Sequence, residues 1–223
     1  MFPGAPEPLI DLSTGINPIP YPLPPLPPDV FVRLPEPAAL EGLWIQQIAK
    51  GDRAAFERLY RAYQRPLFRY FLHFVHEPEH AEELCNDVMV EVWKSAARFK
   101  GRSRPSVWIF GIAYHKAIDA LRRRRPPVVE LRAVEAIVAA DARQSPEASA
   151  VRDSVRKDVA TALLSLSVDH RAVMVLTFGH GYSYDEIAQV MGCPVNTVKT
   201  RMFYAKRQLK EALERRGVRK EIS

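Results

Sequence analysis

The segment 182–209, YSYDEIAQVMGCPVNTVKTRMFYAKRQL, restricts the fold of this chain more than any other stretch. Ile187 and Ala188 fall on the inner face of a first helix, where a small alanine lets a second helix approach closely. Gly192 follows where a left-handed residue would end that helix, and Cys193–Pro194 form the turn. An apolar stripe at helical spacing then defines the second helix: Val198, Met202, Ala205 and Leu209. The segment therefore predicts a helix-turn-helix.

The opposite face of the second predicted helix is basic and aromatic. It carries Asn196, Lys199, Thr200, Arg201, Phe203, Tyr204, Lys206 and Arg207. The alternative interpretation is an ordinary amphipathic hairpin with solvated charges, but a helix pair packed only for stability needs no such turn and basic face together. A helix-turn-helix places its second helix in the major groove of DNA. Asn196 could also cap this helix, since asparagine is a good N-cap residue.

Composition narrows the class of protein. The chain has 223 residues, of which 47% are hydrophobic, and this fits one or two globular domains. Its formal net charge of +6 favours a polyanionic partner, although a basic protein without such a partner fits the charge as well. Cys85 and Cys193 lie on separate helical segments without metal-ligand spacing, so we expect no disulfide and no metal site. No long apolar run and no secretory signal are present, so we expect no membrane span. Two free thiols fit a reducing cytoplasm, where we expect the protein to act.

The pattern divides the chain into a proline-rich tail, two helical parts and a linker. The first 37 residues hold twelve of the nineteen prolines, which predicts an extended or disordered tail. Helical periodicity then predicts helices from Leu43 to Lys50, after Asp52, after Glu77–Pro78 and from Ser106 to Arg125, with Pro66 expected to kink the second. Residues 128–149 are ambiguous and linker-like, and helical pattern resumes at Arg152. The prediction is an all-α fold of two small helical domains joined by a flexible linker.

The segment 99–125 combines aromatic and basic residues. Phe99, Trp108, Phe110 and Tyr114 supply flat apolar surfaces, and Lys116 and a run of four arginines supply cations. Aromatic rings that stack on unpaired bases, beside cations that follow the backbone, hold single-stranded nucleic acid. Two other interpretations stay open: Trp108 is a core residue, and the arginine run is a solvated helix end favoured by the helix dipole.

Together, three blocks of this chain resemble the bacterial sigma-70 family of RNA polymerase sigma factors, in particular its small extracytoplasmic-function (ECF) group. HAEELCNDVMVEVWKSAARF is similar to the family's polymerase clamp-binding helix, FKGRSRPSVWIFGIAYHKAIDALRR to its promoter-melting loop and −10 helix, and the segment from Leu166 to Leu213 to region 4, which reads the −35 element. The resemblance covers about residues 42–216. It implies a non-catalytic subunit, without a cofactor or metal, that directs core polymerase to promoters and helps to melt the −10 region.

The resemblance also implies roles for individual residues. Binding to the clamp coiled coil of the core polymerase falls to Glu82, Glu83, Asn86, Asp87 and Glu91. Binding or melting of the −10 element falls to Phe99, Lys100, Arg102, Ser103, His115, Lys116, Asp119, Arg122 and Arg123. Contacts with the −35 element fall to Asn196, Thr197, Lys199, Thr200, Arg201, Phe203, Tyr204, Lys206 and Arg207. His115 departs from the asparagine of many relatives, and Asn196 from their glycine.

The domain organisation that follows is a tail over residues 1–40, region 2 over 41–126, a linker over 127–150, region 4 over 151–217 and a short C-terminal tail over 218–223. Expected partners are the core polymerase, through its clamp and flap, promoter DNA that is duplex at −35 and single-stranded at −10, and an anti-sigma factor. The alternatives are a LuxR-type helix-turn-helix regulator, which would need a receiver or sensor domain that the first half does not resemble, and an enzyme. The latter rests on the first forty residues, which resemble the start of the pyridoxal-phosphate enzymes of cobalamin synthesis that decarboxylate threonine phosphate.

Overall fold

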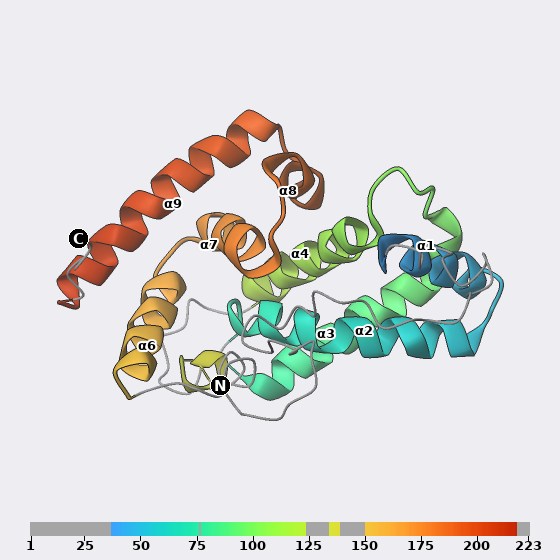
Figure 1. Ribbon diagram of the computed structural model, residues 1–223, viewed down its shortest axis with the longest axis horizontal. Coiled ribbons are helices and arrows are strands. Elements are labelled where there is room, and N and C mark those ends of the chain that lie inside the picture. Colours follow the sequence, from blue (N-terminus) through green and yellow to red (C-terminus); the bar gives the residue numbers. More distant parts are fainter. Residues whose placement is uncertain (1–36, 76, 124–133, 139–149, 218–223) are drawn as a thin grey trace, which may run out of the picture. The chain divides into compact units, whose positions relative to one another are not determined.

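The computed structural model describes residues 37–75, 77–123, 134–138 and 150–217, and within these residues every regular element is helical. The first half contains α1 (Pro37–Ile48), α2 (Arg53–Leu72), α3 (Pro78–Ser95), the short helix η2 (Ala96–Arg98) and α4 (Pro105–Arg123). The second half contains α6 (Ala150–Leu164), α7 (Val168–Met174), η3 (Val175–Gly179), α8 (Tyr184–Met191) and α9 (Val195–Arg215) (Figure 1). The all-α prediction is confirmed.

Local sequence signals explain several helix ends. Asp52 caps α2 and accepts hydrogen bonds from the backbone N–H groups of Ala54 and Ala55, as its position before an apolar-periodic segment predicts. Pro78 occupies the first turn of α3, where its missing N–H costs nothing. Pro66 lies inside α2 and does not end that helix. The first helix begins at Pro37, several residues before the predicted start at Leu43.

The core of the first half is built by α1, α2, α3 and α4. Leu59, Leu67 and Phe71 of α2 are fully buried together with Val88 and Val92 of α3. Trp93 of α3 is 37% exposed, and its ring meets that of Phe56 edge-on, with the ring centroids 5.2 Å apart. Beyond Val92, the buried face of α3 continues to Ser95, which is 6% exposed.

The two halves share one hydrophobic core. The cluster of buried apolar side chains runs without a break from α1 to α9, and α4 packs against α8. Within the predicted linker, residues 134–138 form a helical turn whose Val134, Ile137 and Val138 are buried in the same cluster. The predicted tail ends too late, because residues 37–40 already belong to α1, and residue 150 of the predicted linker begins α6. Residues 1–36, the rest of the linker and residues 218–223 lie outside the described residues.

Candidate nucleic-acid interface

The α8–α9 pair has the predicted helix-turn-helix geometry. Ser183 and Glu186 form a capping box at the start of α8, in which the Ser183 hydroxyl accepts from the Glu186 N–H and the Glu186 carboxylate accepts from the Ser183 N–H. Gly192 ends α8 in the left-handed conformation, at φ 61°. The predicted stripe is buried at Val198, Met202 and Ala205. Asn196 does not cap α9, because α9 begins at Val195 after Pro194 and no side chain caps it.

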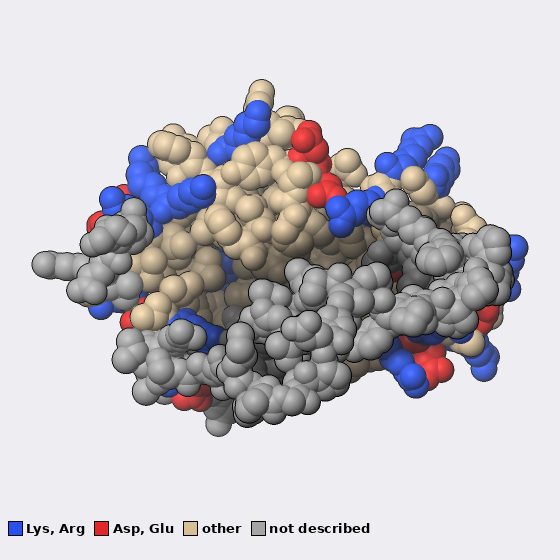
Figure 2. Space-filling model, viewed as in Figure 1, with Lys and Arg blue, Asp and Glu red and all other residues tan. Residues whose placement is uncertain are grey.

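The outer face of α9 exposes most of the residues that the sequence predicts for DNA. Phe203 is 64% and Tyr204 40% exposed, far above the exposure of core aromatic residues. The Arg207 guanidinium carbon lies 4.9 Å from the Tyr204 ring centroid, and the Lys206 ammonium lies 5.9 Å from the ring of Phe178. Also exposed on this helix are Asn196, Lys199 and Thr200, whereas Thr197 is half-buried. Figure 2 shows Lys and Arg side chains over α9 on this face.

Arg201 differs from its neighbours on α9. Its guanidinium forms an ion pair with Asp169 of α7 at 2.5 Å and donates to the Cys193 sulfur at 3.6 Å. About a quarter of its side chain is exposed. Arg201 therefore ties the recognition helix to α7, and it would have to leave Asp169 to reach a DNA phosphate.

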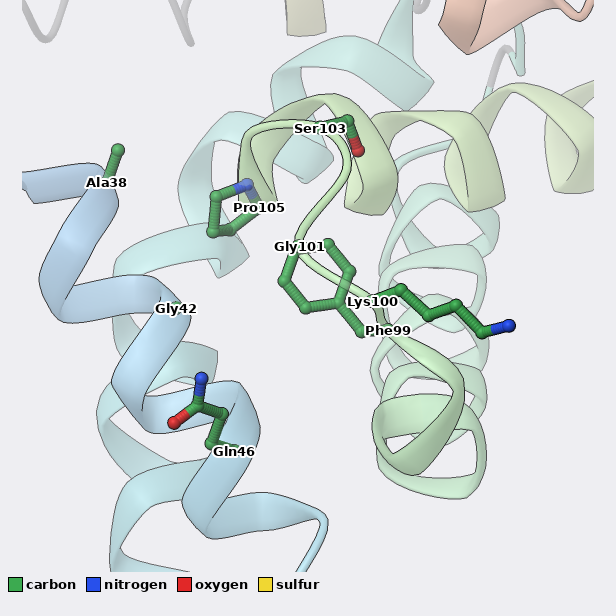
Figure 3. A pocket seen from close by; sticks show the side chains of 8 residues that line it. All are labelled: Ala38, Gly42, Gln46, Phe99, Lys100, Gly101, Ser103 and Pro105. Atoms are coloured by element: carbon green, nitrogen blue, oxygen red, sulfur yellow. The ribbon is translucent and has the colours of Figure 1, made fainter.

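A second candidate site is a cavity of about 310 Å³ between α1 and the loop that joins η2 to α4. Figure 3 shows the Phe99 ring beneath this loop and the Lys100 side chain directed away from the cavity. The Phe99 ring lies 4.9 Å from that of Trp108, and Gly101 holds the loop in a left-handed conformation at φ 66°. The lining residues are Ala38, Gly42, Gln46, Phe99, Lys100, Gly101, Ser103 and Pro105. The three from α1 were not predicted, because nothing in their types signals a site.

The surface of α4 continues from this loop. His115 and Asp119 are exposed, and the Arg122 guanidinium lies 3.8 Å from the Asp119 carboxylate. Lys116 is half-buried, with its ammonium 3.7 Å from the carboxylate of Asp87 on α3. Arg102 is exposed in the loop, Arg123 ends α4, and the side chain of Arg123 is outside the described part. The −10 residues predicted from the sequence thus form a band from the loop along α4.

The predicted polymerase-binding residues form an exposed strip on α3. Glu82, Glu83, Asn86 and Asp87 are exposed, and the Tyr60 hydroxyl donates to the Asn86 side chain at 3.0 Å. Glu91 is half-buried beside Arg98. Sequence reasoning missed Val90, which is 48% exposed one turn after Asn86 and Asp87 on the same helix face. The strip is therefore acidic with an apolar end.

The described residues contain no cluster of His, Cys, Asp and Glu able to hold a metal ion. Burial and, to a smaller extent, the nearby Glu82 carboxylate raise the pKa of the Cys85 thiol to about 12, so this thiol stays protonated at neutral pH. Cys85 is therefore a core residue rather than a nucleophile. Of the described helices, none is long and apolar enough to cross a membrane.

Comparison with known proteins places both halves in one family. Residues 59–126 match the family model for sigma-70 region 2, and residues 156–209 match that for sigma-70 region 4. The chain is 30% identical over 177 residues to the RNA polymerase sigma-H factor of Pseudomonas aeruginosa, covering 76% of this chain and 92% of that protein. It is 29% identical over 169 residues to the ECF sigma-E factor of Escherichia coli, covering 73% of this chain and 88% of that protein.

Solved structures agree at the level of the fold. The structure of CnrH in complex with the cytosolic domain of CnrY is similar with a TM-score of 0.59 and 24% identity, and covers 78% of this chain and 97% of that chain. The first half matches sigma-70 region 2, which a LuxR-type regulator would replace by a receiver or sensor domain, so this match favours the sigma factor over the LuxR-type alternative. The ordered pair of region 2 and region 4, the helix-turn-helix geometry and the relatives agree: the chain belongs to the sigma-70 family, as an ECF-type RNA polymerase sigma factor that directs the polymerase to promoters and has no catalytic role of its own.

Proposed function

We propose that this sigma factor holds a promoter at two places and the core polymerase at a third. In this assignment residues 41–126 act as region 2, residues 127–150 as the linker and residues 151–217 as region 4. The exposed face of α9 reads duplex DNA at −35. The loop cavity with α4 captures unpaired bases at −10, and the acidic strip of α3 binds the clamp of the core enzyme. The chain then acts in the cytoplasm, where the polymerase works.

The separation of charge over the surface is the observation that carries this proposal. Between Val195 and Lys210, α9 has five basic residues and no acidic one. The exposed part of α3 between Glu82 and Asp87 has three acidic residues and no basic one. A basic face attracts the phosphate backbone, and an acidic face disfavours DNA and suits a basic protein surface. A basic face and an acidic face on one small chain fit a subunit that binds promoter DNA with one and the polymerase with the other.

The −35 contacts divide by chemistry. Lys199, Thr200, Phe203 and Tyr204 face outward for base edges, and Lys206 and Arg207 are suited to phosphates. We expect Lys199→Ala to weaken promoter binding by about 1–3 kcal/mol for the preferred −35 sequence only. Lys206→Ala should instead weaken binding to all sequences equally. It should also reduce the slope of log affinity against log salt concentration by about one. Fluorescence anisotropy over a salt series measures both, and equal losses across all sequences for Lys199→Ala would contradict its role as a base reader.

The cavity beside Phe99 suits a base that has left the duplex. Stacking of one base on an aromatic ring contributes about 1–3 kcal/mol. Phe99→Ala should therefore slow open-complex formation, read as the fluorescence of 2-aminopurine placed in the −10 element. The matched control is Val155→Ala, which truncates an exposed apolar residue of α6. If Phe99→Ala melts promoters as the parent does, the cavity holds no base.

Run-off transcription tests the whole proposal. Core polymerase with this chain should initiate at a promoter that core alone ignores. Asp87→Arg should abolish both core binding in pull-down and transcription, because it places a cation in the acidic strip. Glu214→Arg is the control, since Glu214 is an exposed carboxylate at the far end of α9. If the Asp87→Arg variant still binds core polymerase, α3 is not the helix that docks on it.

An inhibitory protein partner belongs to the same proposal. A solved structure similar to this chain, with a TM-score of 0.50 and 23% identity, is the sigma factor RpoE of Bartonella quintana in complex with the anti-sigma factor NepR. We expect an anti-sigma factor to hold this chain away from the core enzyme. Capture of the chain from its own cells, with and without Asp87→Arg, followed by mass spectrometry, tests for such a partner beside the polymerase.

A further inference from the structure

Helix α1 forms one wall of the cavity beside Phe99, and it is firmly held there by the rest of the fold. Ile45 and Ile48 of α1 are buried, with 1% and 3% of each residue exposed, so one face of this helix belongs to the core. The Tyr63 hydroxyl of α2 donates to the Glu41 carboxylate of α1 at 2.7 Å. Helix α1 also packs against η2, which leads into the Phe99 loop. The α1 residues that line the cavity therefore have a fixed position relative to this loop.

Gln46 is the polar one of the three lining residues that α1 supplies. Figure 3 shows its amide on the α1 side of the cavity and the Phe99 ring on the loop side. Gln46 is exposed, and among the described residues its amide has no hydrogen-bond partner. The next residue, Gln47, does not line the cavity, and its side-chain oxygen accepts from Arg58 at 3.3 Å. The Gln46 amide is thus free to bind a ligand in the cavity.

The other side chains around the cavity distinguish one base from another poorly. Phe99 offers a ring face, on which any base can stack. The Ser103 hydroxyl can both donate and accept, so it can pair with every base. The Lys100 side chain is directed away from the cavity (Figure 3). Of the lining side chains, Gln46 is therefore the one suited to select between bases.

We propose that Gln46 reads the identity of the unpaired base that enters this cavity and that it favours adenine. This inference rests on the proposed capture of a −10 base beside Phe99 and adds the residue that selects the base. The cavity volume of about 310 Å³ lies at the lower end of the range for small-ligand sites, which suits a single base.

The preference for adenine follows from the hydrogen-bonding groups of the amide. A glutamine side chain presents an N–H donor beside an oxygen acceptor. The major-groove edge of adenine presents the complementary pair, an acceptor at N7 and a donor at N6. On the same edge guanine presents two acceptors, cytosine a donor and thymine one acceptor. On this edge, adenine is therefore the base that takes both bonds of the Gln46 amide.

The size of the preference follows from the same pairing. A good bidentate pair discriminates against the wrong base by roughly 5- to 150-fold. Gln46 is exposed in the free protein and must be ordered on binding, which offsets part of this gain. We therefore expect adenine to be favoured by about 5-fold, at the lower end of that range.

Four substitutions separate base selection from base capture. Gln46→Leu removes both polar groups of the amide, and Gln46→Glu leaves only acceptors, which suit the N4 donor of cytosine. Gln47→Leu is the matched control, because it changes the adjacent glutamine outside the cavity. Gly42→Leu fills the cavity instead: a Cβ added at Gly42 has no atom from another part of the described chain within 4 Å, and leucine favours a helix more than glycine does.

The assay uses the holoenzyme, formed from core polymerase and the full chain, on a promoter library with a fixed −35 element and a randomised −10 element. Open complexes that resist heparin are recovered and sequenced. We expect the parent and Gln47→Leu to favour adenine at one position by about 5-fold. Gln46→Leu should lose the preference at that position alone, and Gln46→Glu should shift it toward cytosine. Gly42→Leu should lower the yield of open complexes for all sequences.

The inference is overturned if Gln46→Leu keeps the parent's preference at every position, or if Gln46→Glu still favours adenine. If Gln46→Leu relaxes a position at which the parent prefers another base, the assignment to adenine is wrong. A failure of the proposed function gives a different result, because Gly42→Leu would then form open complexes as well as the parent does.

Discussion

Arg171 offers the sharpest test of how the structure is held together. Its side chain is buried, with 7% exposed, and its two terminal nitrogens donate to the carbonyl groups of His73, Leu164 and Leu166. Burial lowers the pKa of Arg171 to about 10, so the guanidinium remains charged at neutral pH. These bonds join the ends of α2 and α6 to α7. Arg171→Met keeps a long apolar side chain and removes every donor.

The size of the effect follows from the acceptors that lose their partner. A buried acceptor left without a hydrogen bond costs about 1–3 kcal/mol, and the Leu164 and Leu166 bonds are fully buried. Relief from burying a charge offsets part of this cost. We therefore expect Arg171→Met to lower the free energy of unfolding by about 2–4 kcal/mol. For a chain of this length that corresponds to roughly 5–15 °C in Tm.

Urea denaturation followed by circular dichroism measures this difference. Arg171→Lys should lose less, because an ammonium group still donates to one or two of the carbonyls. Lys210→Met, which replaces an exposed cation of α9, should change the stability by less than about 0.5 kcal/mol. If Arg171→Met is as stable as the parent, water replaces Arg171 as the hydrogen-bond donor to the three carbonyl groups. Arg171 then does not contribute to holding the ends of α2 and α6 against α7.

Three further predictions concern the cap of α8, acid sensitivity and the tail. Ser183→Ala should lower the free energy of unfolding, measured by urea denaturation, by about 1 kcal/mol, because it removes the two hydrogen bonds of the Ser183 hydroxyl with Glu186. Ser167→Ala should cost less, because the Ser167 hydroxyl makes a single cap bond, from the His170 N–H. Burial lowers the pKa of His73 and His180 to about 4, with Arg171 and Arg69 acting in the same direction on His73, and Arg69 and His73 on His180. These histidines bind protons more readily in the unfolded chain, so their contribution to stability is complete above about pH 6.5 and falls as the pH drops toward 4. We expect a lower urea midpoint at pH 5.5 than at pH 7.5. His180→Gln should show a smaller drop between the two pH values. Removal of residues 1–36 should leave run-off transcription intact. Removal of residues 1–42 should impair it, because α1 lines the cavity beside Phe99. Equal activity of the two truncated proteins would contradict a role for α1.

Several parts of the fold and of the candidate site follow from local sequence. Asp52, Ser183 and Gly192 act through neighbouring backbone groups, so their positions predict helix ends without any tertiary information. The burial of Val198 and Met202 follows from helical periodicity, which also leaves Lys199 and Phe203 on the opposite, exposed face. The prediction that Asn196 caps α9 is wrong, because α9 begins one residue earlier, at Val195, directly after Pro194. Residue type alone did not distinguish a start after Pro194 from a start after Asn196.

The sequence by itself determined the helical class, the helix-turn-helix, the basic face of α9 and the acidic strip of α3, since each depends on residues within a few helical turns of one another. Only the tertiary structure decided which groups meet across long separations. It placed α1 beside Phe99 to form a cavity, turned Arg201 toward Asp169 and joined Tyr114 to Asp169 across the two halves. These contacts depend on how whole helices pack, and neither periodicity nor residue type specifies which helix faces will meet.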